Sequence, residues 1–137
     1  MVEFDGRDLS PANSGEWANI KGAEFYNCRF LGVETSNFLG SQGLRFIDCR
    51  FEQCNLSNIN VTGFVLRDGI FESCKLVGIN WTSCASLMGP QFKDCKIDLS
   101  VFQRLKLRSL ECSQCSAKEV DFAEADLSKS NFTGSTL

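Results

Sequence analysis

The side chains in this sequence that could do chemistry are mainly cysteines and carboxylates, because the chain has eight cysteines and no histidine. The tightest cysteine spacings are Cys112 to Cys115 and Cys49 to Cys54. A structural zinc site needs four nitrogen or sulfur ligands that converge on one point. Histidine is also the commonest general base. Whether the cysteines and carboxylates can act together therefore depends on the elements that carry them.

Composition limits the class of protein. A length of 137 residues, with 43% hydrophobic and 23% charged residues, fits one folded domain. The net charge of -3 is too small to indicate nucleic-acid binding. No apolar run approaches the roughly 18 residues that cross a bilayer, and the polar start MVEFDGRDLS does not resemble a secretory signal. We therefore expect a cytoplasmic protein that binds neither nucleic acid nor membrane directly.

A large apolar residue returns every five residues along most of the chain, as in LRFIDCRFEQCNLSN and VDFAEADLSKSNFTG. This period is neither the 3.6 of a helix nor the 2 of a half-buried strand. A small or apolar residue stands two places before each large one. We call these the small and the central positions, and neither carries a charge in our register. Both are predicted to face a dry interior.

The register of central positions runs from Ile20 to Leu137. The spacing between central residues contains one extra residue within 36–45 and another within 87–91. We call these two the gained residues, and Phe38 is an alternative central residue near the first of them. The predicted central residues are Ile20, Phe25, Phe30, Thr35, Gly40, Phe46, Phe51, Leu56, Val61, Leu66, Phe71, Leu76, Trp81, Ser86, Phe92, Ile97, Phe102, Leu107, Cys112, Ala117, Phe122, Leu127, Phe132 and Leu137.

A second period of 20–21 residues separates Phe30, Phe51, Phe71 and Phe92. Such columns of like residues are expected when four five-residue faces form one coil and successive coils stack, as they do in solenoids. The sequence therefore predicts an all-β, quadrilateral β-helix of about six coils over residues 20–137. Residues 1–19 are predicted to lie outside the coils and to cap the first one.

The segments ADLSK at 125–129 and SNFTG at 130–134 match the motif of the pentapeptide-repeat family, and the chain resembles that family from Ile20 to Leu137. The resemblance implies a right-handed four-sided β-helix. The best-understood members mimic duplex DNA, bind DNA gyrase and protect it from quinolones. This chain departs from them, because its insertions are single residues and it ends without their C-terminal helix and dimer module.

This fold would give the reactive side chains structural roles. Seven cysteines fall in small positions and Cys112 in a central one, so we expect them to be buried, reduced and free of metal. Asp121, Glu124 and Asp126 fall on the outside of a convex rod, where no pocket shifts their pKa. No Ser–His or Cys–His pair exists, and no phosphate-binding glycine loop. We therefore predict no catalytic site and no cofactor, and hence no enzymatic activity.

Two surface features could bind a partner. The first is a basic stripe across one corner, which is otherwise an ordinary charged surface: Arg104, Lys106 and Arg108. The second is a set of outward apolar residues on one face, which contacts either a partner or a bulged loop: Ile47, Val65, Leu87 and Met88.

The C-terminal coil is predicted to lack a cover. Its central residues are Phe122, Leu127, Phe132 and Leu137. An uncovered strand edge beside an apolar core recruits another strand or another copy of itself. We therefore expect either a homodimer through 117–137 or a natural chain that continues.

The function that these observations favour is a non-enzymatic binding or scaffold module that presents flat faces to a protein partner. The alternative is a DNA mimic that binds DNA gyrase or another topoisomerase and confers quinolone protection. The small net charge and the basic stripe argue against this alternative.

Overall fold

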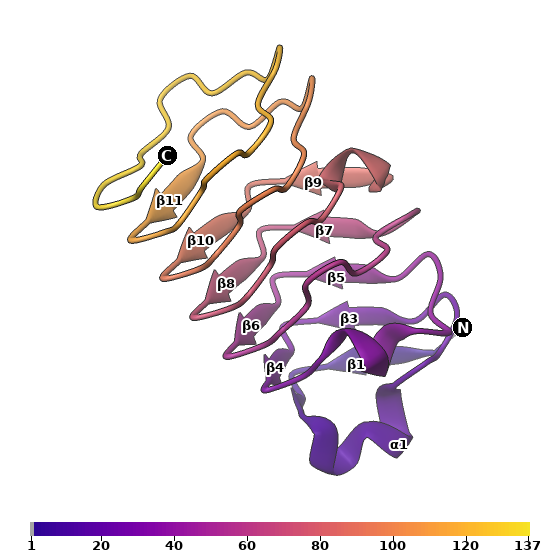
Figure 1. Cartoon of the computed structure of the whole chain (residues 1–137). Coiled ribbons are helices and arrows are strands. Elements are labelled where there is room, and N and C mark those ends of the chain that lie inside the picture. The colour runs from indigo at the N-terminus through magenta and orange to yellow at the C-terminus, as the bar shows by residue number, and fades with distance from the viewer. Residues whose placement is uncertain (1) are drawn as a thin grey trace.

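Short parallel strands form two walls in the computed structural model, which describes residues 2–137 (Figure 1). We call the wall of five strands the first face: β1 (Glu3–Asp5), β3 (Glu24–Tyr26), β5 (Arg45–Ile47), β7 (Val65–Arg67) and β9 (Ser86–Met88). We call the wall of six strands the second face: β2 (Asp8–Leu9), β4 (Arg29–Leu31), β6 (Arg50–Glu52), β8 (Ile70–Glu72), β10 (Gln91–Lys93) and β11 (Glu111–Ser113).

Two further walls are held by isolated bridges between successive coils. The third face includes the ladder Glu34, Asn55, Lys75, Lys96, Ser116 and Thr136, and the fourth includes the ladder Asn80, Val101 and Asp121. The helical elements are η1 (Pro11–Asn13), α1 (Ser14–Trp17), η2 (Thr35–Phe38) and η3 (Trp81–Ser83). No helix within residues 2–137 is long and apolar enough to cross a bilayer. The chain visits the four faces in turn, which confirms the predicted quadrilateral β-helix.

The corners between faces form because the residue two places after a central residue adopts the left-handed backbone conformation. Asn27, Asp48 and Asp94 show it, with φ of 53°, 54° and 51°. Asparagine, aspartate and glycine tolerate this region best. Leu99 and Arg104 also adopt it, with φ of 60° and 61°. A turn of this kind every five residues gives the coil its four sides.

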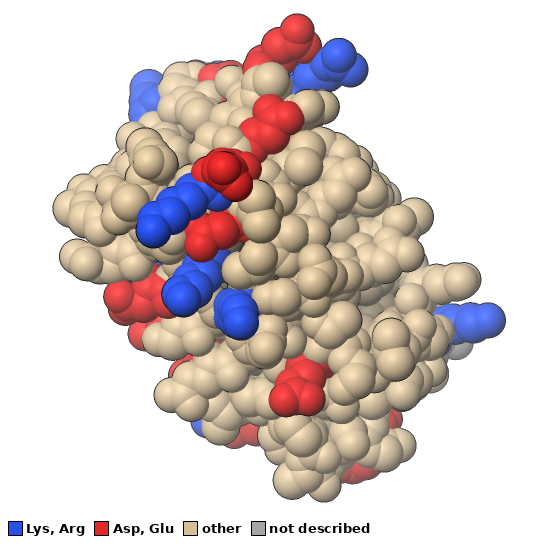
Figure 2. Space-filling view, in the orientation of Figure 1, with Lys and Arg blue, Asp and Glu red and all other residues tan. Residues whose placement is uncertain are grey.

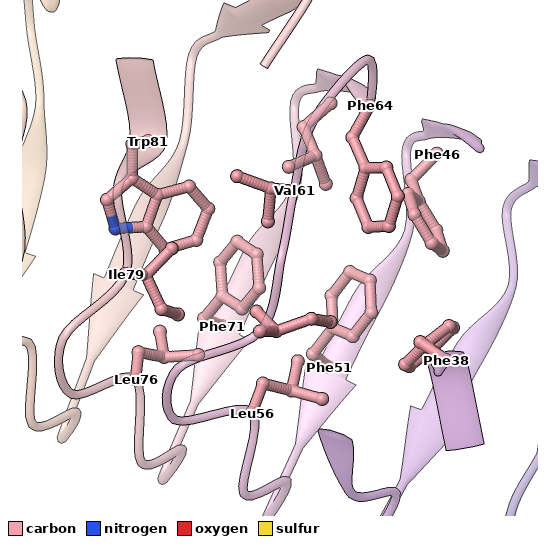
Figure 3. Close-up of a pocket in the computed structure, with 12 residues that line it drawn as sticks. Phe38, Phe46, Phe51, Leu56, Val61, Phe64, Phe71, Leu76, Ile79 and Trp81 are labelled. Carbon is pink, nitrogen blue, oxygen red and sulfur yellow. The ribbon is translucent and has the colours of Figure 1, made fainter. Parts of the chain in front are cut away.

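The core consists of central residues stacked on their equivalents in the next coil. The ring centroids of Phe51 and Phe71 lie 4.8 Å apart, and those of Phe71 and Phe92 lie 5.3 Å apart. This confirms the predicted phenylalanine column. Residues such as Val61 and Trp81 converge on these rings from the other faces (Figure 3) and leave a cavity of only about 20 Å³. The rod is therefore filled along its axis.

The register differs from the prediction at the first gained residue. Gly40 is exposed, so its assignment as a central residue is wrong. Phe38 is buried instead, and its ring centroid lies 6.1 Å from those of both Phe30 and Phe46. The chain accommodates its extra residue in η2, a 3₁₀ turn that carries Phe38 into the core.

The second gained residue also lies elsewhere than predicted. Leu87, not Ser86, is paired with the central residue Leu66 in the sheet, and Leu87 packs against the core. The assignment of Ser86 as central and of Leu87 as outward is therefore wrong. The extra residue lies between Trp81 and Leu87, where the corner that contains η3 is one residue longer than a regular corner. This shift also removes Cys84 from the small position, and it is half-buried.

The coils begin earlier than residue 20. Strand β1 belongs to the first face and β2 to the second, and there Phe4 pairs with Phe25 and Leu9 with Phe30. The boundary predicted at residue 19 is therefore wrong, because Phe4 and Leu9 already follow the five-residue spacing. The Arg7 guanidinium lies 6.0 Å from the centroid of the Phe4 ring. A capping role for the segment around α1 stays a prediction.

The stacked core makes Phe71 a sensitive position. Phe71 is 2% exposed, so Phe71→Ala should lower the free energy of unfolding by about 3–5 kcal/mol through lost burial and a residual cavity. Urea denaturation monitored by circular dichroism measures this. Leu39→Ala is the control, because Leu39 is 78% exposed and its truncation should change stability by less than about 0.5 kcal/mol. Equal effects of the two changes would contradict the described core.

Candidate interaction surface

The cysteines in small positions each make the same kind of hydrogen bond. The Cys74 thiol donates to the carbonyl of Phe51 at 3.2 Å, and the Cys95 thiol donates to that of Phe71 at 3.3 Å. The same bond is made by Cys28, Cys49, Cys54 and Cys115, each to the central phenylalanine of the preceding coil. The hydroxyl of Ser100 donates to Leu76 in the same way at 3.0 Å. A small residue with one polar hydrogen thus links each coil to the one before it.

Burial raises the pKa of the half-buried Cys84 thiol to about 12. Hydrogen bonding with the thiols of Cys115 and Cys74, together with burial, raises the pKa of Cys95. Hydrogen bonding with neighbouring thiols lowers the pKa of Cys74 and of Cys115 in turn. All eight cysteines are free, and no group of three or more metal-binding side chains comes together within residues 2–137. Thiols that stay protonated, such as those of Cys84 and Cys95, are poor ligands and poor nucleophiles.

The acidic cluster near the C-terminus serves the local turns. The Asp121 carboxylate accepts hydrogen bonds from the backbone N–H of Ala123 at 2.9 Å and from the Gln103 amide, which lower its pKa. The hydroxyl and backbone N–H of Ser128 bind the Asp126 carboxylate and lower its pKa. Both carboxylates are therefore ionised acceptors near neutral pH. They hold no proton for a general acid to donate.

The predicted apolar residues all belong to strands of the first face, but only three of them lie on its outer side. Ile47 and Met88 lie in the same outer column, because both pair with Arg67 of β7. Val65 lies in the neighbouring column of the same wall. Met88 is 53% exposed, whereas Leu87 points into the core as described above. The outer side of the first face therefore carries three of the four predicted residues.

The first face also carries residues that the sequence analysis missed. Tyr26 occupies the column of Ile47 one coil earlier, and Arg67 occupies it one coil later. The Tyr26 hydroxyl donates to the Glu24 carboxylate at 2.7 Å, which raises the pKa of Tyr26. The spacing of 20–21 residues from Ile47 was the signal that identifies both. Tyrosine, methionine and arginine are enriched in protein interfaces.

The predicted basic stripe is neutralised by carboxylates of the last coil. The Arg104 guanidinium lies 2.9 Å from the Glu124 carboxylate, and that of Arg108 lies 3.9 Å from Asp126. The backbone of Lys106 forms a β-bridge with that of Asp126, one coil later in the same column. These partners are about 20 residues apart in sequence. The two arginines of the stripe are therefore in exposed ion pairs, and such pairs contribute little to stability.

A second group of lysines lies on the third face. The backbones of Lys75 and Lys96 form a β-bridge, and both side chains are exposed. The Asp98 carboxylate accepts hydrogen bonds from the Ser116 hydroxyl and the backbone N–H of Lys118, which lower its pKa although burial opposes the shift. Basic and acidic side chains mix toward one side of the molecule, and a broad area beside them carries no charge (Figure 2).

The final coil exposes part of its core. Phe122 stacks on Phe102 with ring centroids 5.4 Å apart, but Phe122, Leu127 and Phe132 are only partly buried. Leu137 is 70% exposed. Within residues 2–137 no further segment covers these four side chains. They form the surface for which self-association is predicted.

Comparisons with known proteins identify the repeat. The sequence model described as "Pentapeptide repeats" matches residues 45–82 and 95–134 in eight copies. No protein of curated function matches the chain.

Similar solved structures include forms of QnrB1, described as a plasmid-mediated fluoroquinolone resistance protein. The full-length form is 12% identical, with 99% of this chain and 91% of that chain covered and a TM-score of 0.36. A trypsin-treated variant is 19% identical, with 98% and 71% covered and a TM-score of 0.32. Both scores are low, so the likeness says nothing about what this chain binds.

The Cys84 thiol predicts one contribution to the pH dependence of stability. A thiol in the unfolded chain ionises near about pH 8.5, whereas Cys84 in the folded chain ionises at about 12. Between these values the unfolded state binds fewer protons, so the free energy of unfolding should fall as the pH rises above about 8.5. Urea denaturation at a series of pH values measures this.

The control for this prediction is Cys84→Ser, which should make the decline with pH shallower because it removes one ionising thiol. A decline that is equally steep in the variant would contradict a contribution from Cys84.

Proposed function

Because the chain belongs to the pentapeptide-repeat family, whose fold is a right-handed quadrilateral β-helix, we propose that it is a non-enzymatic module that docks a protein partner in the cytoplasm. The observation that carries this proposal is the composition of the first face. Four of its parallel strands, β3, β5, β7 and β9, present Tyr26, Ile47, Val65, Arg67 and Met88 side by side.

The geometry of the first face suits a protein better than a small molecule. The core behind it is filled, so the wall offers a flat surface and not a cleft that would enclose a small ligand. Its side chains are held at fixed spacing by the strands, which lowers the entropy that binding must remove. Met88 and Ile47 supply apolar area, and Arg67, which is exposed, supplies charge next to it. Interfaces of proteins combine these features.

The alternative, a DNA mimic that binds DNA gyrase, requires continuous lines of negative charge. On the second face the acidic residues alternate with arginines. The Arg29 guanidinium lies 3.6 Å from Asp8 and 3.5 Å from Glu52, and that of Arg50 lies 3.2 Å from Glu72. These ion pairs cancel the negative potential that a mimic of DNA phosphates would present. We therefore favour another protein partner.

Photo-crosslinking tests the role of the first face. With p-benzoylphenylalanine in place of Met88, irradiation of the native host should give one discrete covalent adduct with a protein. Ile47→Glu in the same chain should abolish the adduct, because a carboxylate in the contact would be desolvated without a partner. Leu31→Glu on the second face is the matched control and should preserve it. An adduct that is indifferent to Ile47→Glu would contradict docking on this face.

A supercoiling assay with DNA gyrase, with and without a quinolone, separates the two functions. The favoured function predicts that the purified chain neither inhibits supercoiling nor protects gyrase from the drug. Protection in this assay would establish the alternative.

We also propose that the chain forms a homodimer through its last coil. Phe122, Leu127, Phe132 and Leu137 would bury their apolar area against a second copy, and a two-fold contact would close the assembly at two chains. Light scattering should then show a dimer. Leu137→Glu should give a folded monomer, since this exposed residue contributes little to the fold, whereas Phe132→Glu should give a monomer or an unfolded chain. A stable monomer of the unaltered chain would contradict this proposal.

A further inference from the structure

A cavity of about 210 Å³ opens between η2 and the coil that follows it. It lies between the segment that ends at Gln42 and the residues Asn58, Ile59 and Asn60 of the next coil. None of these residues belongs to the first face, so the cavity is separate from the surface considered above. It is also separate from the small apolar void in the core.

The cavity originates at the first gained residue of the register. Ser41 stands two places before the left-handed Gly43, as Val61 stands two places before the left-handed Gly63 in the next coil. A serine therefore occupies a place that a larger apolar side chain fills one coil later. The volume that serine leaves empty is only partly taken by Phe38, which enters the core from η2.

Polar groups without partners line the cavity. The hydroxyl oxygen of Ser41 is buried and makes no hydrogen bond within residues 2–137. Asn60 accepts a hydrogen bond from the backbone N–H of Thr62 at 3.0 Å, which fixes its side chain and leaves the amide N–H₂ available. Gln42, Asn58 and Asn60 are exposed, and the side-chain amides of Gln42 and Asn58 form no hydrogen bond with the described part of the chain. These amides are therefore free to exchange water for the polar groups of a ligand.

The rest of the lining is apolar and uncharged. Ile59 is 8% exposed and Phe38 is 5% exposed, so both form the inner wall. Leu39 stands at the cavity with 78% of its surface exposed, the highest value among the large apolar residues described. None of the residues that line the cavity is charged. A charged ligand would lose its hydration there without gaining an opposite charge.

We propose that this cavity binds an uncharged peptide segment of a partner protein. The side-chain amides of Gln42, Asn58 and Asn60 offer both donors and acceptors, which match the N–H and C=O groups of a peptide backbone. An aliphatic side chain of the segment would lie between Leu39 and Ile59 and cover both from water.

The test uses N-acetyl-L-leucine N-methylamide as the probe, because it carries two peptide groups and one aliphatic side chain. Titration into the ¹⁵N-labelled full chain should give saturable shifts of the backbone amide signals around Ser41, Gln42 and Asn58. The glutamate analogue of the probe should bind at least about tenfold more weakly, because its carboxylate finds no opposite charge.

Three variants locate the binding site. Leu39→Ser should lower the affinity for the probe at least about fivefold through lost apolar contact. Ser41→Val should lower this affinity by filling the cavity. Leu31→Ser replaces an exposed leucine outside the cavity and should leave the affinity unchanged. Correct folding of each variant is verified by its amide spectrum.

Several outcomes would overturn the proposal. These are the absence of saturable shifts, equal binding of the glutamate analogue, equal affinity in the Leu39→Ser variant, and tighter binding of methyl glucoside, which would indicate a neutral sugar instead. The proposal does not depend on the first face. Loss of crosslinking at Met88 with retained probe binding would refute only the proposed function, and the reverse result would refute only this cavity.

Discussion

The vertical register of the coils is the constraint on which the rest of the structure depends. Each backbone ladder joins a residue to its equivalent about 20 residues later, so like side chains come to lie on like. The Phe51 and Phe71 rings stack at 4.8 Å because their strands pair residue for residue. A shift of one residue would move a charged side chain into the core. The absence of charge from the central positions therefore fixes the register throughout the rod.

The small positions solve a second problem of this narrow core. The carbonyl groups at the central positions point along the rod and would be buried beside apolar rings. A thiol or hydroxyl in the next coil donates to them, as Cys74 does to Phe51 and Ser100 to Leu76. Cysteine combines a small apolar body with a weak donor, so it fits where alanine would leave the carbonyl less well satisfied. The abundance of cysteine follows from packing.

The surfaces proposed for binding arise from the same constraint and from its interruption. Where the register is regular, outer side chains form columns, and Tyr26, Ile47, Arg67 and Met88 become neighbours although 20–21 residues separate them in sequence. Where the register gains a residue, η2 carries Phe38 inward and the small Ser41 leaves a cavity. Regular coils thus provide flat faces, and the irregular corner provides a concave site.

Two periods in the sequence determined the architecture. The five-residue period requires a turn at every fifth residue, and the period of 20–21 residues sets four faces for each coil. Together they predicted the four faces and the phenylalanine column correctly. They did not determine where the two extra residues lie, since Gly40 and Ser86 fit the spacing as well as their neighbours do. Only the tertiary structure decided this, because packing in η2 and η3 selects Phe38 and Leu87 for the core. The pairing of Arg104 with Glu124 was likewise decided only when stacking brought adjacent coils together.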